Sequence, residues 1–446
     1  MARLSSLTLL LALLLTLPGL AVRAQNQPDA TSLGRVNPLY VYEPTVIAIP
    51  TIERHPGVPA EVDTFARIIR RDLQLTGFFK MPANEQMVNQ LYAQDNRAGN
   101  LNFEAWRGIG AVHLLLARVV PDEGGRLAAE VMLHDVESGT AIMQRRISGP
   151  ADKVRLLAHK ISDEVVRFTK NVDGFAQTQI LFTGEHTRGV REVGIMDADA
   201  FNLRPITRYG KTVASPVWGQ NGTEAFYTSY HGNLAIIYGH ILATDQTWRV
   251  AAYGGTNHSA AWSEAAQRLV MVLSRDGNSE IYTSARDGSG LTRLTNTPSV
   301  TEGSPTWSPD GRRIAFVSNE TGNAQIWVMN ADGSGRRRLT SRGAWNDAPS
   351  WSPDGRRIAF VCREGGINDI FIVNADGSPG SYKRLTKGQG QNESPTWAPN
   401  STHLAFSSNR TGNWQIYLML DDGSNQVQLT NTGSNRQPAW GPMPRN

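Results

Sequence analysis

The stretch SPTWSPDGRRIAFVSN at 304–319 is nearly repeated at 349–363 as PSWSPDGRRIAFVCR, with 44 residues from one tryptophan to the next. Further copies, aligned on their tryptophans, give successive separations of 44, 45, 44, 46 and 43 residues. A constant period of about 40–50 residues, with four strand-like segments in each unit, is typical of propeller blades. The tryptophans that mark the repeats are Trp218, Trp262, Trp307, Trp351, Trp397 and Trp440.

Each repeat divides into four strands by its own chemistry. In the copy that begins at 304, SPTW, RRIAFVS, QIWVMNADG and RRRLT are the four strands in order. The SPDG between the first two predicts a tight turn, because proline fixes φ and glycine accepts a positive φ. We therefore interpret the repeated phrase as construction: the tryptophan packs between neighbouring blades and SPDG reverses the chain.

The ends of the repeat array indicate how the ring closes. Trp440 begins a repeat that has no further strands after it, whereas 179–207 holds QILFTG, EVGIMDADA and NLRPIT, which resemble a second, third and fourth strand without a first. Joined together, these segments make one blade from both ends of the propeller. Such a composite blade closes a six-bladed ring and removes its open sheet edges.

The region before the propeller has a different texture. A short apolar run, TVIAIPTI, predicts a buried strand, and Pro59 begins a helix with apolar positions on one face. Three strands and a second helix from Pro150 follow, so we expect helices packed on one face of a sheet. The predicted fold class is multidomain: an N-terminal mixed α/β domain, then a C-terminal six-bladed β-propeller with a composite blade. The predicted strands are 45–52, 112–120, 126–136 and 140–147.

The N-terminal 24 residues predict export. They combine Arg3, an apolar run from Leu7 to Leu17 and a small residue at Ala24, as in a cleaved secretory signal. Residues 25–42 are polar and irregular, and we interpret them as a flexible arm that is either a linker or a partner-binding segment. The predicted domains are 1–24 (signal peptide), 25–42 (N-terminal arm), 43–175 (α/β domain) and 176–446 (propeller).

Charge and motifs argue against several functions. The net charge of +4 falls to +2 without Arg3 and Arg23, which is too weak for a dedicated nucleic-acid or anionic-membrane binder. There is no G-x-S-x-G and no H-E-x-x-H, and one cysteine with nine scattered histidines gives no zinc spacing. GIG at 108–110 precedes a predicted strand, so it indicates a turn and not a dinucleotide site. We therefore predict no catalytic residue, no cofactor and no bound metal.

The loops vary where the strands recur. The segments before each tryptophan strand and those after each second strand meet on one face of a propeller, around its central channel. They are rich in Asn, Asp, Glu, His and Arg. We interpret this rim as a docking surface, and ordinary hydrophilic loops are the alternative.

The exported chain, the α/β domain and the SPxWSPDGxxIAFVSN repeats closed by a terminal PAW together resemble the TolB family of the Tol–Pal envelope system in Gram-negative bacteria. The resemblance implies a monomeric, non-enzymatic periplasmic adaptor that supports outer-membrane integrity and constriction during division. It implies that the lipoprotein Pal docks on the propeller mouth and that TolA is engaged through the arm. The implied partner-binding residues are His258, Thr301, Glu302, Asn346, Asp347, Asn392, Glu393, Asn435 and Arg436.

A competing hypothesis is a secreted propeller enzyme or small-ligand binder that uses the central channel. It requires an acid, base or metal cluster that converges in the channel. Rim carboxylates such as Glu302 or Asp347 could hold a cation there, but their spacing alone does not show it.

Overall fold

The computed structural model describes residues 42–444 except 188 and 232–233. The predicted signal peptide and, apart from Tyr42, the predicted arm lie outside the described residues. The chain forms two compact units that divide between Asn171 and Val172.

The N-terminal unit is built on a six-stranded sheet in the order β3-β1-β4-β5-β6, with β2 beside β4. β1 is parallel to β3 and β4 because helices lie in the connections, whereas β4, β5 and β6 form an antiparallel meander. The strands are β1 (Thr45–Ala48), β2 (Glu53–Arg54), β3 (Phe79–Lys80), β4 (His113–Asp122), β5 (Arg126–Asp135) and β6 (Thr140–Pro150). The helices are η1 (Ala60–Thr64), α2 (Phe65–Leu75), α3 (Glu85–Ala98), α4 (Phe103–Gly108), η2 (Glu123–Gly125) and α5 (Val154–Lys170).

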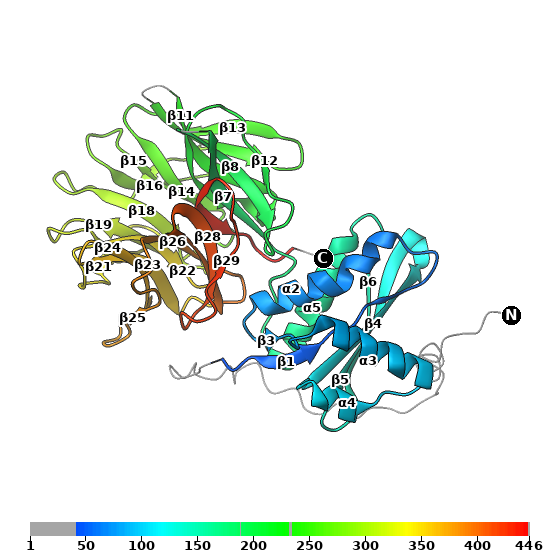
Figure 1. Cartoon of the computed structure of the whole chain (residues 1–446). Coiled ribbons are helices and arrows are strands. Elements are labelled where there is room, and N and C mark those ends of the chain that lie inside the picture. Colours follow the sequence, from blue (N-terminus) through cyan, green and yellow to red (C-terminus); the bar gives the residue numbers. More distant parts are fainter. Residues whose placement is uncertain (1–41, 188, 232–233, 445–446) are drawn as a thin grey trace. The chain divides into compact units, whose positions relative to one another are not determined.

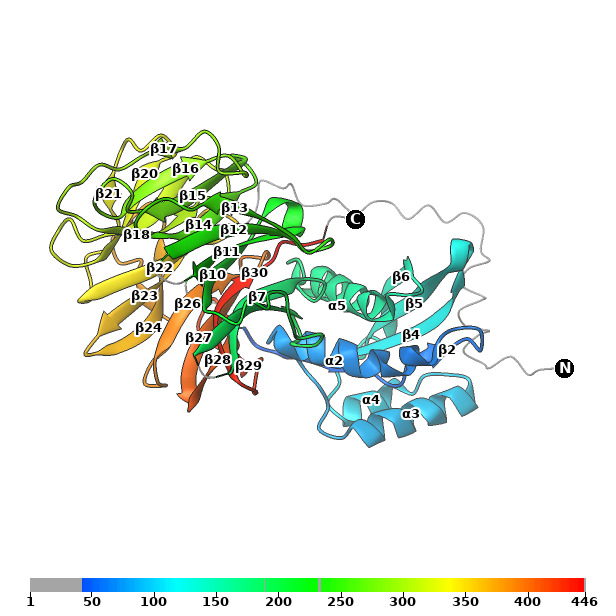
Figure 2. The same ribbon diagram turned by 90° about the horizontal axis from the view of Figure 1, so that it is seen from above.

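Helices cover both faces of this sheet, so the expectation of one covered face was wrong. Leu114 of β4 belongs to a buried cluster with Val88 of α3 and Trp106 of α4. The strand register places Gly149 of β6 on the opposite face, where Leu157 of α5 lies against it. α2 and α5 lie side by side there (Figure 2). The layer formed by α3 and α4 was not expected, because neither helix was predicted from the sequence.

The C-terminal unit is a six-bladed propeller of four-stranded antiparallel sheets, which follow one another from green to red in Figure 1. The first sheet is β10 (Val213–Trp218), β11 (Glu224–His231), β12 (Leu234–Ile241) and β13 (Gln246–Ala251), with η3 (Gln220–Gly222) between β10 and β11. The second sheet is β14 (Asn257–Ser263), β15 (Arg268–Leu273), β16 (Glu280–Ser284) and β17 (Thr292–Arg293), and the third is β18 (Glu302–Trp307), β19 (Arg313–Ser318), β20 (Gln325–Asn330) and β21 (Arg337–Arg338). The fourth sheet is β22 (Trp345–Trp351), β23 (Arg357–Glu364), β24 (Ile367–Asn374) and β25 (Lys383–Arg384), and the fifth is β26 (Asn392–Trp397), β27 (His403–Thr411), β28 (Asn413–Leu420) and β29 (Val427–Gln428).

The sixth sheet joins both ends of the unit. β30 (Ser434–Trp440) pairs antiparallel with β7 (Gln179–Thr187), which continues into β8 (Val190–Asp197) and β9 (Arg204–Pro205). Trp440 lies opposite Ile180 in the register, and its Nε1 donates a hydrogen bond to Thr178 Oγ1 (2.8 Å).

The repeated phrase has the construction role that its chemistry predicted. Trp397 packs in a buried cluster with Ala359 of the preceding blade, and its Nε1 donates to the Ser350 carbonyl of that blade (3.1 Å). In the SPDG turn, Asp310 accepts from the Arg312 N–H (3.1 Å), and Gly311 has the positive φ of 67° that the turn requires.

Candidate functional site

The same backbone irregularity occurs in the first strand of all six blades, close to the central channel. Each strand has a register shift against its neighbour, and at each shift one residue has a positive φ between 44° and 53°. None is glycine, and in five cases proline follows, so each bulge costs of order 1 kcal/mol. Bulges of this kind turn a strand and redirect its side chains at functional edges. The six residues are Ser215, Ser259, Ser304, Ala348, Ser394 and Gln437.

All the predicted rim residues except Thr301 stand one or two positions before a bulge. The residue two positions before each bulge is buried, and in four blades it is an asparagine with no exposed surface. Asn346, for example, donates through Nδ2 to Gln325 Oε1 of the preceding blade (2.7 Å). These side chains hold neighbouring blades together. Three of them, Asn346, Asn392 and Asn435, are among the predicted partner-binding residues, and they have no exposed surface. The four are Asn257, Asn346, Asn392 and Asn435.

The residue directly before each bulge is half-buried and lies on the innermost strand of its blade, where the first strands of neighbouring blades contact one another. Four of the predicted residues occupy this position: His258, Asp347, Glu393 and Arg436. Asp347 Oδ1 accepts from Ser304 Oγ and from the Ala348 N–H (both 2.6 Å), and burial raises the pKa of this carboxyl. Burial likewise lowers the pKa of His258, so the neutral imidazole is favoured.

The remaining rim positions differ in exposure. Thr301 is exposed, and its N–H donates to Asn319 Oδ1 (2.8 Å). Glu393 Oε1 accepts from Asn368 Nδ2 (3.1 Å). Burial lowers the pKa of Arg436, and the negative charge of Glu393 opposes this change. The sequence prediction therefore brings together a set of channel-mouth side chains, but with interblade amides mixed into it.

Three arginine–aromatic pairs at the mouth were missed by the sequence analysis. Arg436 of β30 stacks over the Trp414 ring of β28, with 4.0 Å from the guanidinium carbon to the ring centroid. Arg363 lies over Trp345 at 4.9 Å. Arg275, after β15, lies over Tyr253 at 4.5 Å. The sequence does contain a sign of these pairs, because Trp345, Trp414 and Tyr253 are aromatic residues in otherwise polar stretches. They lie outside the set of regularly spaced tryptophans on which the repeats were aligned.

Glu302 departs from the pattern of buried amides. It stands where four other first strands carry asparagine, and it is 1% exposed. Its Oε1 accepts from Thr297 Oγ1 (3.2 Å) and Arg336 Nη2 (2.8 Å), and the same threonine hydroxyl contacts the buried Glu280 carboxylate (3.1 Å to Oε2). Two buried carboxylates therefore meet at one blade junction.

The two carboxyls at this junction titrate differently. Burial raises the pKa of Glu302 to about 7, because removal from water outweighs the attraction of Arg336. Burial also pushes the pKa of Glu280 upward, but hydrogen bonds from Thr295 and Thr297 and the Arg293 guanidinium hold it below its ordinary value. Glu302 is thus the member of the pair that changes its charge near neutral pH.

The described part of the propeller unit contains no three His, Cys, Asp or Glu side chains whose ligand atoms lie close enough to share a metal ion. Over the residues with described coordinates, no helix combines the length and the apolar character that a membrane crossing requires. The single cysteine, Cys362, is buried, and burial raises its pKa to about 11, so its thiol is held in the unreactive form.

Comparison with known proteins covers both units. Residues 167–444 match the family model described as "TolB beta propeller domain", and residues 40–142 match the "TolB amino-terminal domain". Two relatives named "Tol-Pal system protein TolB", from Anaeromyxobacter dehalogenans strains 2CP-C and 2CP-1, are 33% and 32% identical over 259 residues, which is 58% of this chain. The match spans 59% of the length of each relative.

A solved structure shows a similar fold. The TolB structure from Acinetobacter baumannii gives a TM-score of 0.77 at 22% identity, covering 90% of this chain and 97% of that one. The arrangement of a mixed α/β unit followed by a six-bladed propeller is thus shared with a solved protein.

Proposed function

The chain belongs to the TolB family, and from that premise we propose that it is a periplasmic, non-enzymatic adaptor of the Tol–Pal system. In this proposal the propeller mouth docks the lipoprotein Pal and the N-terminal arm engages TolA. The adaptor acts as a monomer and supports outer-membrane integrity and constriction during cell division.

The observation that carries the Pal proposal is the chemistry of the mouth. Arginine, tryptophan and tyrosine dominate the energetic centres of protein interfaces, because they bury a large area and still make directed contacts. The mouth presents three such arginine–aromatic pairs around the half-buried Asp347, Glu393 and Arg436. Exposed apolar side chains at the hairpin tips, Tyr230 and Ile367, extend this surface. A folded protein partner fits it better than a small anion or sugar does.

The first test is calorimetric titration of the mature chain with the soluble domain of Pal from the same organism. We expect binding, and we expect Trp345→Ala and Trp414→Ala each to weaken it by about 30-fold or more, as for interface residues worth 2 kcal/mol. Each substitution removes the ring on which an arginine is held. The circular dichroism melt of each variant checks that the propeller remains folded.

The matched control is Arg338→Ala, which removes an exposed arginine from β21, a strand that contributes nothing to the three pairs. This control should bind Pal with unchanged affinity. Loss of binding in the control as well, or equal binding by all variants, contradicts docking at the mouth. No binding by the folded wild-type chain rejects Pal as the partner and redirects the search to ligands of the channel.

The arm proposal has a separate test. Deletion of residues 25–41 is expected to abolish capture of the chain by the periplasmic domain of TolA, while its affinity for Pal stays within about twofold. The reason is that the two partners are assigned to different segments. Unchanged TolA capture by the deleted chain removes the arm from the proposal and leaves the propeller assignment standing.

A further inference from the structure

The N-terminal unit carries a groove between α2 and α3 that the proposed function does not use. Its deeper part has a volume of about 400 Å³. Five apolar side chains line this part: Ile49, Met81, Pro82, Ala83 and Val88. A groove with such a lining favours a ligand that brings an apolar side chain with it.

One wall of the groove is basic. The wall comes from one face of α2, at helical spacing: Arg67, Arg70, Arg71 and Gln74. Arg70 is already engaged, because its Nε donates to the Ile49 carbonyl (2.9 Å) and its guanidinium pairs with Glu85. Arg67 and Arg71 make no ion pair and no side-chain hydrogen bond with any residue that the structure describes. Among the described residues, therefore, nothing competes with an anion for these two guanidinium groups.

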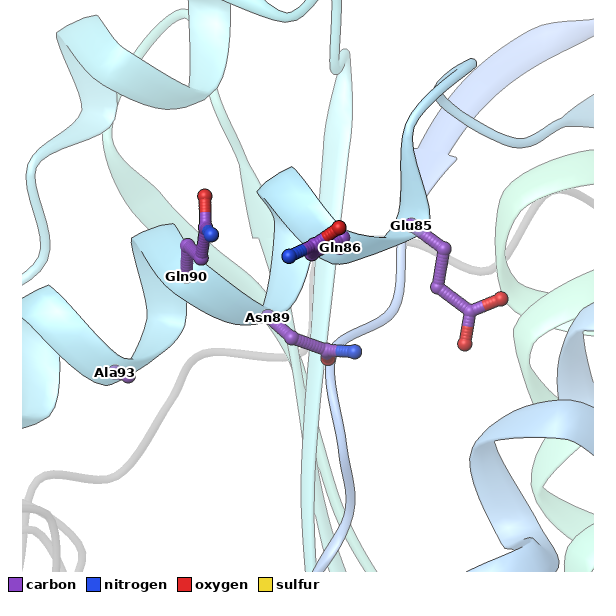
Figure 3. Close-up of a pocket in the computed structure, with 5 residues that line it drawn as sticks. All are labelled: Glu85, Gln86, Asn89, Gln90 and Ala93. Carbon is purple, nitrogen blue, oxygen red and sulfur yellow. The ribbon is translucent and has the colours of Figure 1, made fainter.

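The groove continues over α3 as a second hollow that shares Glu85 with the first. Figure 3 shows the Gln86, Asn89 and Gln90 side chains on the first part of α3, and all three line this hollow. Asn89 is fixed, because its Oδ1 accepts from both the N–H and the hydroxyl of Thr51 (2.9 and 3.1 Å). The Gln86 and Gln90 amides make no hydrogen bonds to described residues. A row of amides on one helix face can donate to and accept from the backbone of an extended chain.

We infer that this α2–α3 groove docks an extended acidic segment of a partner protein. Carboxylates pair with Arg67 and Arg71, whose planar forks match a carboxylate in a bidentate arrangement. An apolar side chain between them enters the part lined by Ile49 and Val88, and the peptide backbone follows the α3 amides. The chain's own segment 25–41 is a poor occupant. Asp29 is its only acidic residue, whereas the groove presents two arginines, Arg67 and Arg71.

The test is fluorescence anisotropy of the mature chain with the fluorescein-labelled peptide GEELPEELG, compared with its uncharged counterpart GQQLPQQLG. We expect the acidic peptide to bind at least about tenfold more tightly, because charge-assisted hydrogen bonds are the stronger ones. Arg67→Ala/Arg71→Ala should remove this difference, and binding should weaken as salt rises. Gln86→Ala/Gln90→Ala should weaken the binding of both peptides equally, because the α3 amides contact the peptide backbone.

The control Arg126→Ala/Lys153→Ala removes the same charge from exposed positions that do not line the groove, and it should leave binding unchanged. Equal binding of the two peptides, or equal loss in this control, overturns the inference. Binding that tightens about tenfold on deletion of 25–41 makes the chain's own arm the occupant and overturns it too. A further result would also overturn the inference: the chain binds phosphatidylglycerol vesicles through Arg67 and Arg71 but does not bind the peptide. The groove would then be a binding site for anionic lipid.

Discussion

Truncation after Gly433 is expected to abolish the cooperative unfolding transition of the propeller. The truncation removes β30, which is the first strand of the sixth sheet and the partner of β7. Burial of Trp440 alone removes about 150–250 Å² from water, worth roughly 4–6 kcal/mol as an upper bound. A domain is typically stable by only about 5–15 kcal/mol, so this loss, together with an exposed β7 edge, exceeds what the propeller can tolerate.

Thermal and urea unfolding, followed by circular dichroism, measure this effect. The matched control is deletion of residues 25–38, which removes a polar segment of similar length and is expected to leave the melting temperature nearly unchanged. Trp440→Ala gives an intermediate loss of about 3–5 kcal/mol, because it leaves the β30–β7 pairing in place. Equal melting temperatures for the two deletions would remove closure by both ends as a source of stability.

The fold was predictable from the sequence where the pattern repeats. The tryptophan period and the SPDG turns located the blade strands, because both depend on local chemistry that every copy repeats. α3 was missed because its apolar positions are sparse in a polar stretch. Its ends did carry a signal: Asn84 caps the first turn by accepting from the Met87 N–H (3.1 Å), and Gly99 ends the helix with a φ of 76°.

The site was predictable only in outline. The loops were correctly expected to be polar, but alternation cannot show which residue of a pair such as Asn346–Asp347 faces the preceding blade and which faces the channel. The bulge at Ala348 decides which of the two side chains faces which way. Ala348 has a positive φ, and since it is not a glycine, the sequence gives no sign of this conformation. The arginine–aromatic pairs join residues from different strands, as Arg436 and Trp414 do, so no local motif contains them.

Glu302→Gln is expected to stabilise the chain increasingly as pH rises. The pKa of Glu302 is about 7 in the folded protein and 4.5 in the unfolded chain, so the folded state holds more protons between these values and stability falls with rising pH. The stability that the protonated Glu302 carboxyl gives to the folded state is fully present below pH 4.5 and is lost as pH passes through 7. A shift of this size corresponds to about 3 kcal/mol in total, most of which falls between pH 5 and pH 8.

The measurement is the difference in unfolding free energy between Glu302→Gln and the wild type, from urea titrations at pH 5 and at pH 8. Glutamine cannot ionise, and an amide at this position matches the asparagines of four other blades, so the variant escapes the loss. The control Glu320→Gln removes a carboxylate that contacts the same Arg336 from an exposed position, where solvent screens the charge. Its difference from the wild type should hardly change with pH. An equal difference at both pH values for Glu302→Gln would mean that this carboxyl stays ionised at the junction, held by Arg336.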